Sequence, residues 1–401
     1  MFNYKNRHCE KGSMANRARL VQRQQEVEAR VREIEAAATR RAEPPTGPEQ
    51  WWPELVEEYG GDDEMFEALK VNKVLFNEAL VLVENAVQDR RGRRSGIRSN
   101  REKLLFLIVY LSQGVRVVEL LVAKWIKTRQ QVQERAKAIA RLFYPHLVGG
   151  AVRFFNESVE DAPDAALIVD CTVCQINRPK RPFDEAKIFF SGKHFIYALK
   201  KEVCVNVRSG TAAVISKAYP GSVHDLKILR DHAHAINDML GGKILLADLG
   251  YQGARHDVPT IVPCDDSLEQ LRTRRVLVEC FFGRLKKMWT VFSTRWKLGE
   301  EVFDTFFDIA CALTNLDILH RPLRQSEAEF NIGILNVILE DMKKAVESQR
   351  EANGRYVRGR REELGIEGVG LVNQESSLFL ICFTGKIIFR RTVAFIDEMI
   401  K

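Results

Sequence analysis

The sequence predicts a mixed α/β domain preceded by an all-helical region. Apolar residues recur mainly at helical spacings before residue 150, whereas short runs of strand-forming residues alternate with helical segments after Gly149-Gly150. A chain of 401 residues with 45% apolar residues can fill the cores of two or three domains. We expect four parts: a basic, disordered arm (1–48), a helical region (49–150), an α/β domain (151–322) and a helical or irregular tail (323–401).

The composition narrows the class of protein only a little. The formal net charge is +7, from 61 basic and 54 acidic residues, which suits nucleic-acid binding and equally an ordinary basic protein. Eight cysteines form no disulfide pattern, and Cys171 and Cys174 are the one C-x-x-C pair, so packing beside a strand end is favoured over a zinc site. Without a secretory signal or a sufficiently long apolar run, we expect an intracellular, soluble protein.

The N-terminal third reads as a polar arm followed by helices. Residues 17–41 are polar, Pro44 to Pro48 resemble a linker, and residues 51–87 have helical spacing. The arginine-rich loop at 90–98 is a solvated linker, a DNA-phosphate contact or a nuclear import signal.

Three helices are expected between residues 101 and 143. They are an apolar helix that Gly114 ends, a short helix over 118–125 and a polar helix over 128–143. This is the layout of a helix-turn-helix DNA reader, although any small helical bundle has the same pattern. In the DNA-binding interpretation, Gln130, Gln131 and Arg135 of the third helix are candidate contacts.

The expected α/β domain contains several short strands and one long amphipathic helix. The strands are expected at 165–169, 187–199, 202–207, 211–216 and 243–247, with a turn at 208–210. Helices are expected to open at Ser222, to span 272–292 and, beyond the domain, to span 328–351.

Two aspartates follow apolar runs, and their positions suggest a metal site. Asp170 ends ALIVD and Asp248 ends KILLAD. A carboxylate at the exit of a buried strand is costly without a partner, and two of them side by side resist joint ionisation. A hard divalent cation such as Mg²⁺ removes that conflict, because it prefers oxygen ligands. The alternative is that each aspartate is a turn or cap residue.

A third acid, Glu279, lies in the long amphipathic helix. Glu279, Gly283 and Lys286 share a helix face, where Gly283 would allow close approach of a backbone. Arg284, Lys286 and Lys287 would supply phosphate-binding charge. A solvated, charged helix face is the competing interpretation.

Several other residues carry weaker signals. Arg178 and Lys193 are candidate phosphate contacts or solvated charges. Asp225 follows Ser222 at capping-box spacing, so a helix cap is expected there. His224 either lies near the site or packs elsewhere, and Tyr251 and Gln252 either shape the pocket or pack a turn.

Taken in order, five motifs resemble the DDE transposases of the PIF/Harbinger group. The motifs, which together fall within about residues 165–320, are IVDCTVCQINRP, FFSGKHFIYALK, PGSVHDLKILRD, LLADLGYQG and VECFFGRLKKMW. The resemblance implies an RNase H-like fold in which Asp170, Asp248 and Glu279 are the catalytic triad that binds two Mg²⁺ or Mn²⁺ ions. The sequence departs from the group at Val173, where a histidine is common, and at Cys280, where a polar or basic residue is frequent.

By this resemblance the chain is expected to be a transposase. It would hydrolyse phosphodiester bonds at transposon ends and transfer strands to target DNA, with one metal ion activating the nucleophile and the other stabilising the leaving oxygen. The resemblance also implies action in the nucleus, or in the cytoplasm if the host is bacterial. A Myb-like DNA-binding partner is implied, and a homo-oligomer is left open. A domesticated Harbinger-derived nuclease and a DNA-binding protein whose catalysis has lapsed are the alternatives.

Overall fold

The computed structural model describes residues 61–69, 71–84, 86, 99–114, 128–155, 159, 164–262 and 269–363. The expected basic arm, the linker, the arginine-rich loop, the short helix over 118–125 and the last 38 residues, 364–401, lie outside these ranges. The helix-turn-helix interpretation therefore stays a prediction, because its middle helix is not described.

The helical region consists of helices whose beginnings are set by local hydrogen bonds. Asn72 caps one helix by accepting from Val74 N at 2.9 Å, and Ser99 forms a capping box with Glu102 at the start of the next. The helices are α3 (Asp62–Leu69), α4 (Lys73–Val83), α5 (Asn100–Gln113) and α7 (Arg129–Ala151).

Helix α7 continues eight residues beyond the predicted end at Phe143, through Gly149-Gly150. A Cβ built on Gly150 would lie 2.7 Å from Leu82 Cδ2, so this glycine lets α7 approach α4 closely. The glycine pair thus serves helix packing, and the expectation that the helix ends before it was wrong for this reason.

The sheet is mixed, with β1 at its centre. Strand β1 pairs antiparallel with β3 and parallel with β6, β7 is parallel to β6, and β4 pairs antiparallel with the other edge of β3. The strands are β1 (Ala165–Gln175), β2 (Phe190–Ser191), β3 (Ile196–Asn206), β4 (Ala212–Ile215), β5 (Tyr219–Pro220), β6 (Ile244–Leu246) and β7 (Thr260–Ile261). This order, in which three antiparallel strands precede two parallel ones, confirms the predicted α/β class with an RNase H-like mixed sheet.

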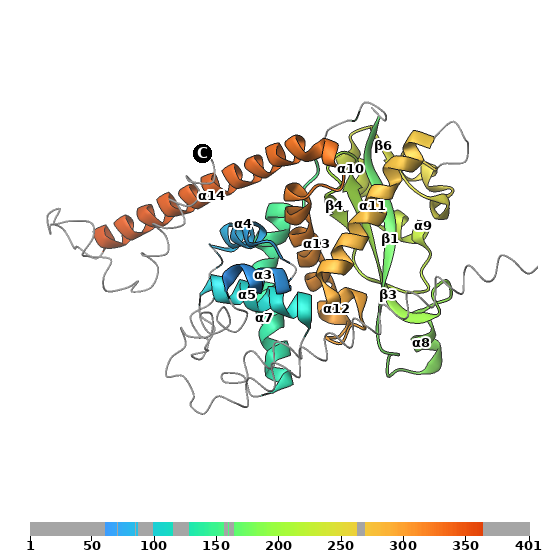
Figure 1. Cartoon of the computed structure of the whole chain (residues 1–401), viewed down its shortest axis with the longest axis horizontal. Coiled ribbons are helices and arrows are strands. Elements are labelled where there is room, and N and C mark those ends of the chain that lie inside the picture. The colour runs from blue at the N-terminus through green and yellow to red at the C-terminus, as the bar shows by residue number, and fades with distance from the viewer. Residues whose placement is uncertain are drawn as a thin grey trace, which may run out of the picture.

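Helices flank the sheet and join it to the helical region. In Figure 1, α11 crosses the sheet in front of β1, and α13 lies between the sheet and the helical region. The helices of this part of the chain are α8 (Phe183–Lys187), α9 (Asp225–Asp231), α10 (Ala233–Leu240), α11 (Glu269–Met288), α12 (Thr290–Ser293), α13 (Phe303–His320) and α14 (Ala328–Glu363). Short 3₁₀ turns are η1 (Leu249–Tyr251), η2 (Ala254–His256), η4 (Glu300–Val302) and η5 (Gln325–Glu327).

Helix α13 is the centre of the larger hydrophobic core. It is buried on nearly all sides, as expected for a helix that is apolar all round. The same core includes residues of α4, α5, α7, α11 and β3, so the helical region and the sheet share it. Among the described helices, none is both long and apolar enough to cross a bilayer.

Several predicted boundaries were wrong for identifiable reasons. The helix expected over 272–292 is two helices, because the buried Trp289 leaves helical geometry while its indole N–H donates to Ala310 O and Thr314 Oγ1. The strand expected over 187–199 is a hairpin, since a turn with Phe195 at φ 57° separates β2 from β3. The expected turn at 208–210 is present, with Gly210 at φ 74°.

Candidate active site

Asp170 lies in the middle of β1, not at its end as predicted. The strand continues to Gln175, because residues 171–175 pair with β3 from Glu202 to Ala198. The first half of β1 is buried on both faces, and buried and part-buried residues begin to mix at Asp170. Cys171 and Cys174 accordingly lie within the strand, and the predicted strand end beside them is absent.

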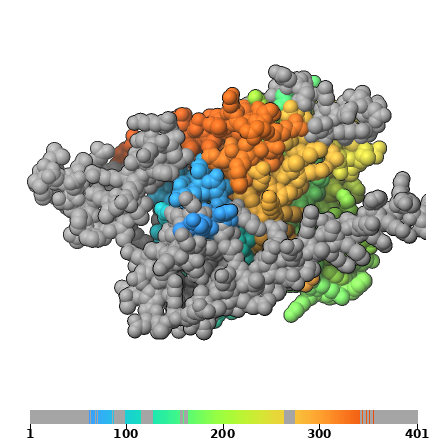
Figure 2. All heavy atoms as spheres, viewed as in Figure 1, coloured from blue at the N-terminus to red at the C-terminus, as the bar shows by residue number. Residues whose placement is uncertain are grey.

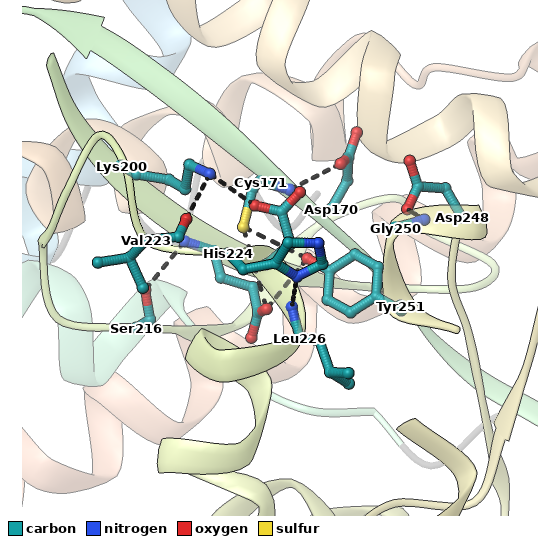
Figure 3. Close-up of polar contacts among 12 residues, drawn as sticks. Asp170, Cys171, Lys200, Ser216, Val223, His224, Leu226, Asp248, Gly250 and Tyr251 are labelled. Atoms are coloured by element: carbon teal, nitrogen blue, oxygen red, sulfur yellow. Dashed lines mark hydrogen bonds and ion pairs between the residues drawn. The ribbon is translucent and has the colours of Figure 1, made fainter. Parts of the chain in front are cut away.

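Asp248 follows β6 and meets Asp170 at the same level of the sheet. Ile168 of β1 is paired in parallel with Leu246 of β6. Two residues after each member of this pair, the chain has an aspartate, Asp170 and Asp248. Asp248 caps the η1 turn by accepting from Gly250 N at 2.8 Å, which orients its carboxylate. Figure 3 shows the Asp170 and Asp248 side chains next to each other.

The surroundings of Asp170 disfavour its charged form. Burial is the largest effect and raises the pKa of Asp170 to about 6, with further increases from the charges of Asp248 and Asp225. The hydrogen bond from Cys171 N at 2.7 Å and the charge of Arg275 act in the opposite direction. The carboxylates thus repel one another at this point of the sheet.

Asp225 belongs to this acidic group, although the sequence predicted a helix cap. His224 caps α9 instead, with Nδ1 accepting from Leu226 N at 3.3 Å, and the helix begins at Asp225, not at Ser222. Asp225 Oδ1 accepts from Lys200 Nζ at 2.8 Å. A Cβ built on Gly250 would lie 2.9 Å from Asp248 Oδ1 and 3.5 Å from Asp225 Oδ2, so both carboxylates border the same glycine.

Glu279 stands on the exposed face of α11, whose buried face packs on β1. Its side chain is 53% exposed and forms an ion pair with Arg275 at 3.4 Å. Arg275 also acts on Asp170, so one guanidinium links the helix to the strand. Among the residues that the structure describes, no group of three or more His, Cys, Asp or Glu side chains is close enough to hold a metal ion. The structure therefore brings Asp170 and Asp248 together, while the full triad stays a prediction.

A buried polar network lies directly beneath these acids. Glu202 of β3, opposite Cys171 in the register, accepts from Tyr251 OH at 3.0 Å and pairs with His232 Nε2 at 2.8 Å. Tyr251 OH also lies 3.3 Å from Cys171 Sγ (Figure 3). Burial raises the pKa of Glu202, while His232 and Tyr251 act against that rise. Tyr251 therefore fixes the η1 turn that carries Asp248 to the strand that carries Asp170.

Sequence reasoning missed Glu202 and His232. The available signal was the charged residue inside the strand-forming run EVCVNV, because a carboxylate in a buried strand requires partners. His232, thirty residues away between α9 and α10, carried no comparable signal.

The three cations predicted to form a basic face on α11 have different surroundings. Arg284 donates to Asp317 at 2.8 Å and to Arg321 O, and Lys286 Nζ donates to Val173 O at 3.0 Å, so both make internal contacts. Lys287 is exposed. A Cβ built on Gly283 would meet nothing within 4 Å, so the expected close approach of a backbone is absent among the described residues.

The remaining DNA-contact candidates lie on α7, in the segment that follows β1 and in the β2–β3 turn. Gln130 and Gln131 are exposed in the first turn of α7, and Arg135 is part-buried, which lowers its pKa. Arg178 is exposed and sits over the Phe183 ring at 5.9 Å, and Lys193 is exposed in the β2–β3 turn. Their contact with DNA stays a prediction.

Comparison with known families agrees with this geometry. No curated protein sequence matches the chain. Residues 169–315 match the family model described as DDE superfamily endonuclease, a stretch that starts beside Asp170, includes Asp248 and Glu279, and ends within α13. The match supports the predicted superfamily and leaves the PIF/Harbinger group as a finer prediction. By fold and by this match, residues 169–315 are similar to the DDE superfamily endonucleases.

Proposed function

We propose that the chain is a transposase-type, metal-dependent DNA endonuclease. The observation that carries the proposal is the meeting of Asp170 and Asp248 on the parallel pair β1–β6 within the stretch that matches DDE endonucleases. Helix α11, packed across β1, carries Glu279 as the third acid of the proposed triad.

The residues at this point fit divalent cations. The part-buried Asp170 lies beside Asp248 and Asp225, and a cation relieves the repulsion among these carboxylates. Asp170, Asp248 and Glu279 would hold two Mg²⁺ or Mn²⁺ ions, Glu279 after release from Arg275. When bound, such ions activate the attacking oxygen and neutralise the leaving one.

The protein residues supply orientation and charge for this chemistry. Gly250 N and Cys171 N hold the two aspartates in fixed rotamers, which limits the reorganisation needed on binding. Lys200, held between Val223 O and Asp225, provides a cation beside the acids. Arg275, once released from Glu279, is placed to meet a phosphate.

The finer proposals follow the resemblance in the sequence. We propose transposon ends as substrates and strand transfer to target DNA as the second step. Action in the nucleus with a Myb-like DNA-binding partner belongs to the same proposal. Cleavage and joining of candidate element ends, with and without a co-expressed partner, would test it.

The test of the endonuclease itself is cleavage of labelled DNA with Mg²⁺ or Mn²⁺. We expect the wild type to cleave, and Asp248→Asn and Glu279→Gln each to reduce the rate by roughly a hundredfold or more, because each removes a charged oxygen ligand. DNA affinity should change less than about twofold. Cleavage at the wild-type rate by Asp248→Asn would refute the proposal, and unimpaired DNA binding without any cleavage would favour a catalytically lapsed DNA-binding protein.

A further inference from the structure

A basic cavity lies between the helical region and the end of α11 that is farther from the sheet's acids. Its volume is about 670 Å³. Among the described residues, its lining combines four cations and one carboxylate with apolar side chains: Lys73, Arg284, Lys287, Arg321, Glu67, Phe66, Val71 and Met288. Figure 2 shows the N-terminal helices, in blue, against the C-terminal part of the molecule. The cavity is thus formed by segments that are far apart in the sequence and carries an excess of positive charge.

Two of these cations are held in place by a buried acid. The Asp317 side chain is fully buried and accepts from Arg284 Nη1 at 2.8 Å and from Arg321 Nε at 3.0 Å. A guanidinium has five N–H donors, so each arginine keeps donors beyond those that Asp317 and the Arg321 carbonyl use. These side chains are therefore ordered before any ligand arrives, which lowers the entropy cost of binding.

The start of α4 adds to the same cavity. Asn72 and Lys73, the cap and first residue of this helix, are part of the lining, and the first turn contains no acidic residue. The positive end of the helix dipole therefore reinforces the four cationic side chains.

An exposed stripe of α11 connects the cavity with the proposed active site. Glu279, Gly283 and Lys287 are all exposed and stand at successive spacings of four residues. From Glu279 to Lys287 the helix rises roughly 12 Å, about the length of three to four nucleotides along one strand. The middle of this path is a glycine whose Cβ position is open, so nothing on the helix blocks it.

We propose that this basic cavity binds phosphates of the DNA backbone on one side of the cleavage site. The inference rests on the proposed function, since it takes DNA as the substrate. It adds a second phosphate-binding site, formed jointly by α3, α4, α11 and the end of α13. Within α11, Lys287 of this site lies about two helical turns from Glu279 of the proposed triad. Lys73 and Lys287 make the contacts that can be removed without exposing Asp317.

The test measures DNA binding without catalysis. Lys73→Gln, Lys287→Gln and the double variant are compared with the wild type by fluorescence anisotropy of a labelled duplex in EDTA. Lys344→Gln, an exposed lysine of α14, is the matched control for the change in charge. Binding is measured from about 50 to 200 mM salt, where the slope of log affinity against log salt falls by about 0.9 for each phosphate that the protein no longer neutralises.

We expect each lysine variant to weaken binding roughly tenfold and to reduce the salt slope by about 1, and the double variant by about 2. Lys344→Gln should match the wild type. The site is overturned if both cavity variants keep the affinity and slope of the control. Because EDTA prevents cleavage, this failure is distinguishable from failure of the endonuclease proposal.

A second arm separates DNA from free phosphate as the occupant. Inorganic phosphate is added in a thermal unfolding experiment on the wild type and the double variant. Stabilisation of the wild type alone, combined with unchanged duplex affinity in the variants, would identify a free-phosphate site and overturn the DNA assignment. We expect the duplex affinity to change.

Discussion

The buried Asp317 and the part-buried Asp170 occupy opposite electrostatic surroundings. The carboxylate of Asp317 on α13 is fully buried and paired with the guanidinium groups of Arg284 and Arg321. The carboxylate of Asp170 on β1 lies beside Asp248 and Asp225. Asp225 is paired with Lys200, and the cation that acts on Asp170 itself, Arg275, is shared with Glu279. One acid is thus neutralised within the fold, whereas the other carries repulsion that the chain alone does not remove.

The difference separates a structural acid from a functional one. A buried charge that has its partners holds elements together, here α11 to the end of α13. A part-buried acid placed among other acids destabilises the fold, and such an acid is kept where a bound cation neutralises it. Removing each acid in turn, and then the groups that support it, tests this contrast.

The largest effect is expected for Asp317→Asn. The change leaves two guanidinium groups without their buried carboxylate and should lower the free energy of unfolding by about 3–5 kcal/mol. Urea unfolding followed by circular dichroism measures it. Asp341→Asn is the matched control, because Asp341 is 47% exposed in its ion pair with Arg153 and should cost at most about 1 kcal/mol. Equal losses in the two variants would remove the contrast.

Asp170→Asn should do the opposite and stabilise the metal-free protein at neutral pH. The folded pKa is raised from 3.8 to about 6, so the folded state binds this proton more tightly than the unfolded state. The contribution of this proton to the free energy of unfolding is fully present below pH about 4 and is lost as the pH rises through about 6. The variant should gain on the order of 2 kcal/mol at pH 7.5 and show a flatter stability profile between those values. A wild-type profile that is already flat there would contradict the raised pKa.

Tyr251→Phe tests the network beneath the acids. It removes the hydrogen bond to Glu202 while keeping the ring, and should cost about 1–2 kcal/mol in thermal unfolding. If Tyr251 positions Asp248, the Mn²⁺ concentration for half-maximal cleavage should also rise severalfold. A stability loss without any change in metal dependence would make Tyr251 a packing residue only.

Gly283→Ala is expected to have the smallest effect and tests whether DNA follows the exposed face of α11. The site is open, so alanine should stabilise the helix by roughly 0.5–1 kcal/mol. If DNA follows this face, the added methyl group should weaken duplex binding about twofold to fivefold, roughly 0.4–1 kcal/mol. Anisotropy measurements beside Gly333→Ala, an exposed glycine of α14 whose Cβ position is equally open, would show whether the effect is specific to α11.

Much of this architecture could be predicted from the sequence, because the local pattern of apolar residues agrees there with the packing in the folded protein. The residues that precede Asp170 and Asp248 are apolar runs, which predicted two strands adjacent in a mixed sheet, and β1 and β6 are indeed paired. Glu279 was predicted to lie in a long amphipathic helix, and α11 contains it. The RNase H-like fold was expected from the family resemblance, whereas the order of the strands is known from the structure alone.

The predictions were wrong where contacts with residues far away in the sequence decide the structure. The pair Gly149-Gly150 predicted the end of a helix, but these glycines lie within α7, where Gly150 packs against α4. Ser222 was predicted to begin a helix, but His224 caps it instead. Arg284 and Lys286 read as free surface cations, yet Asp317 and the carbonyl of Val173 bind them from other elements. The pair of Glu202 and His232 joins β3 to the junction of α9 and α10, which spacing along the chain does not reveal.

The most direct test of this account is Mn²⁺ binding to the DNA-free protein at pH 7.5, followed by the EPR signal of the free ion. We predict that the wild type binds Mn²⁺ and that Asp170→Asn and Asp248→Asn each weaken binding at least tenfold, while Asp341→Asn does not. Wild-type affinity in both active-site variants would contradict the claim that these two aspartates share a cation.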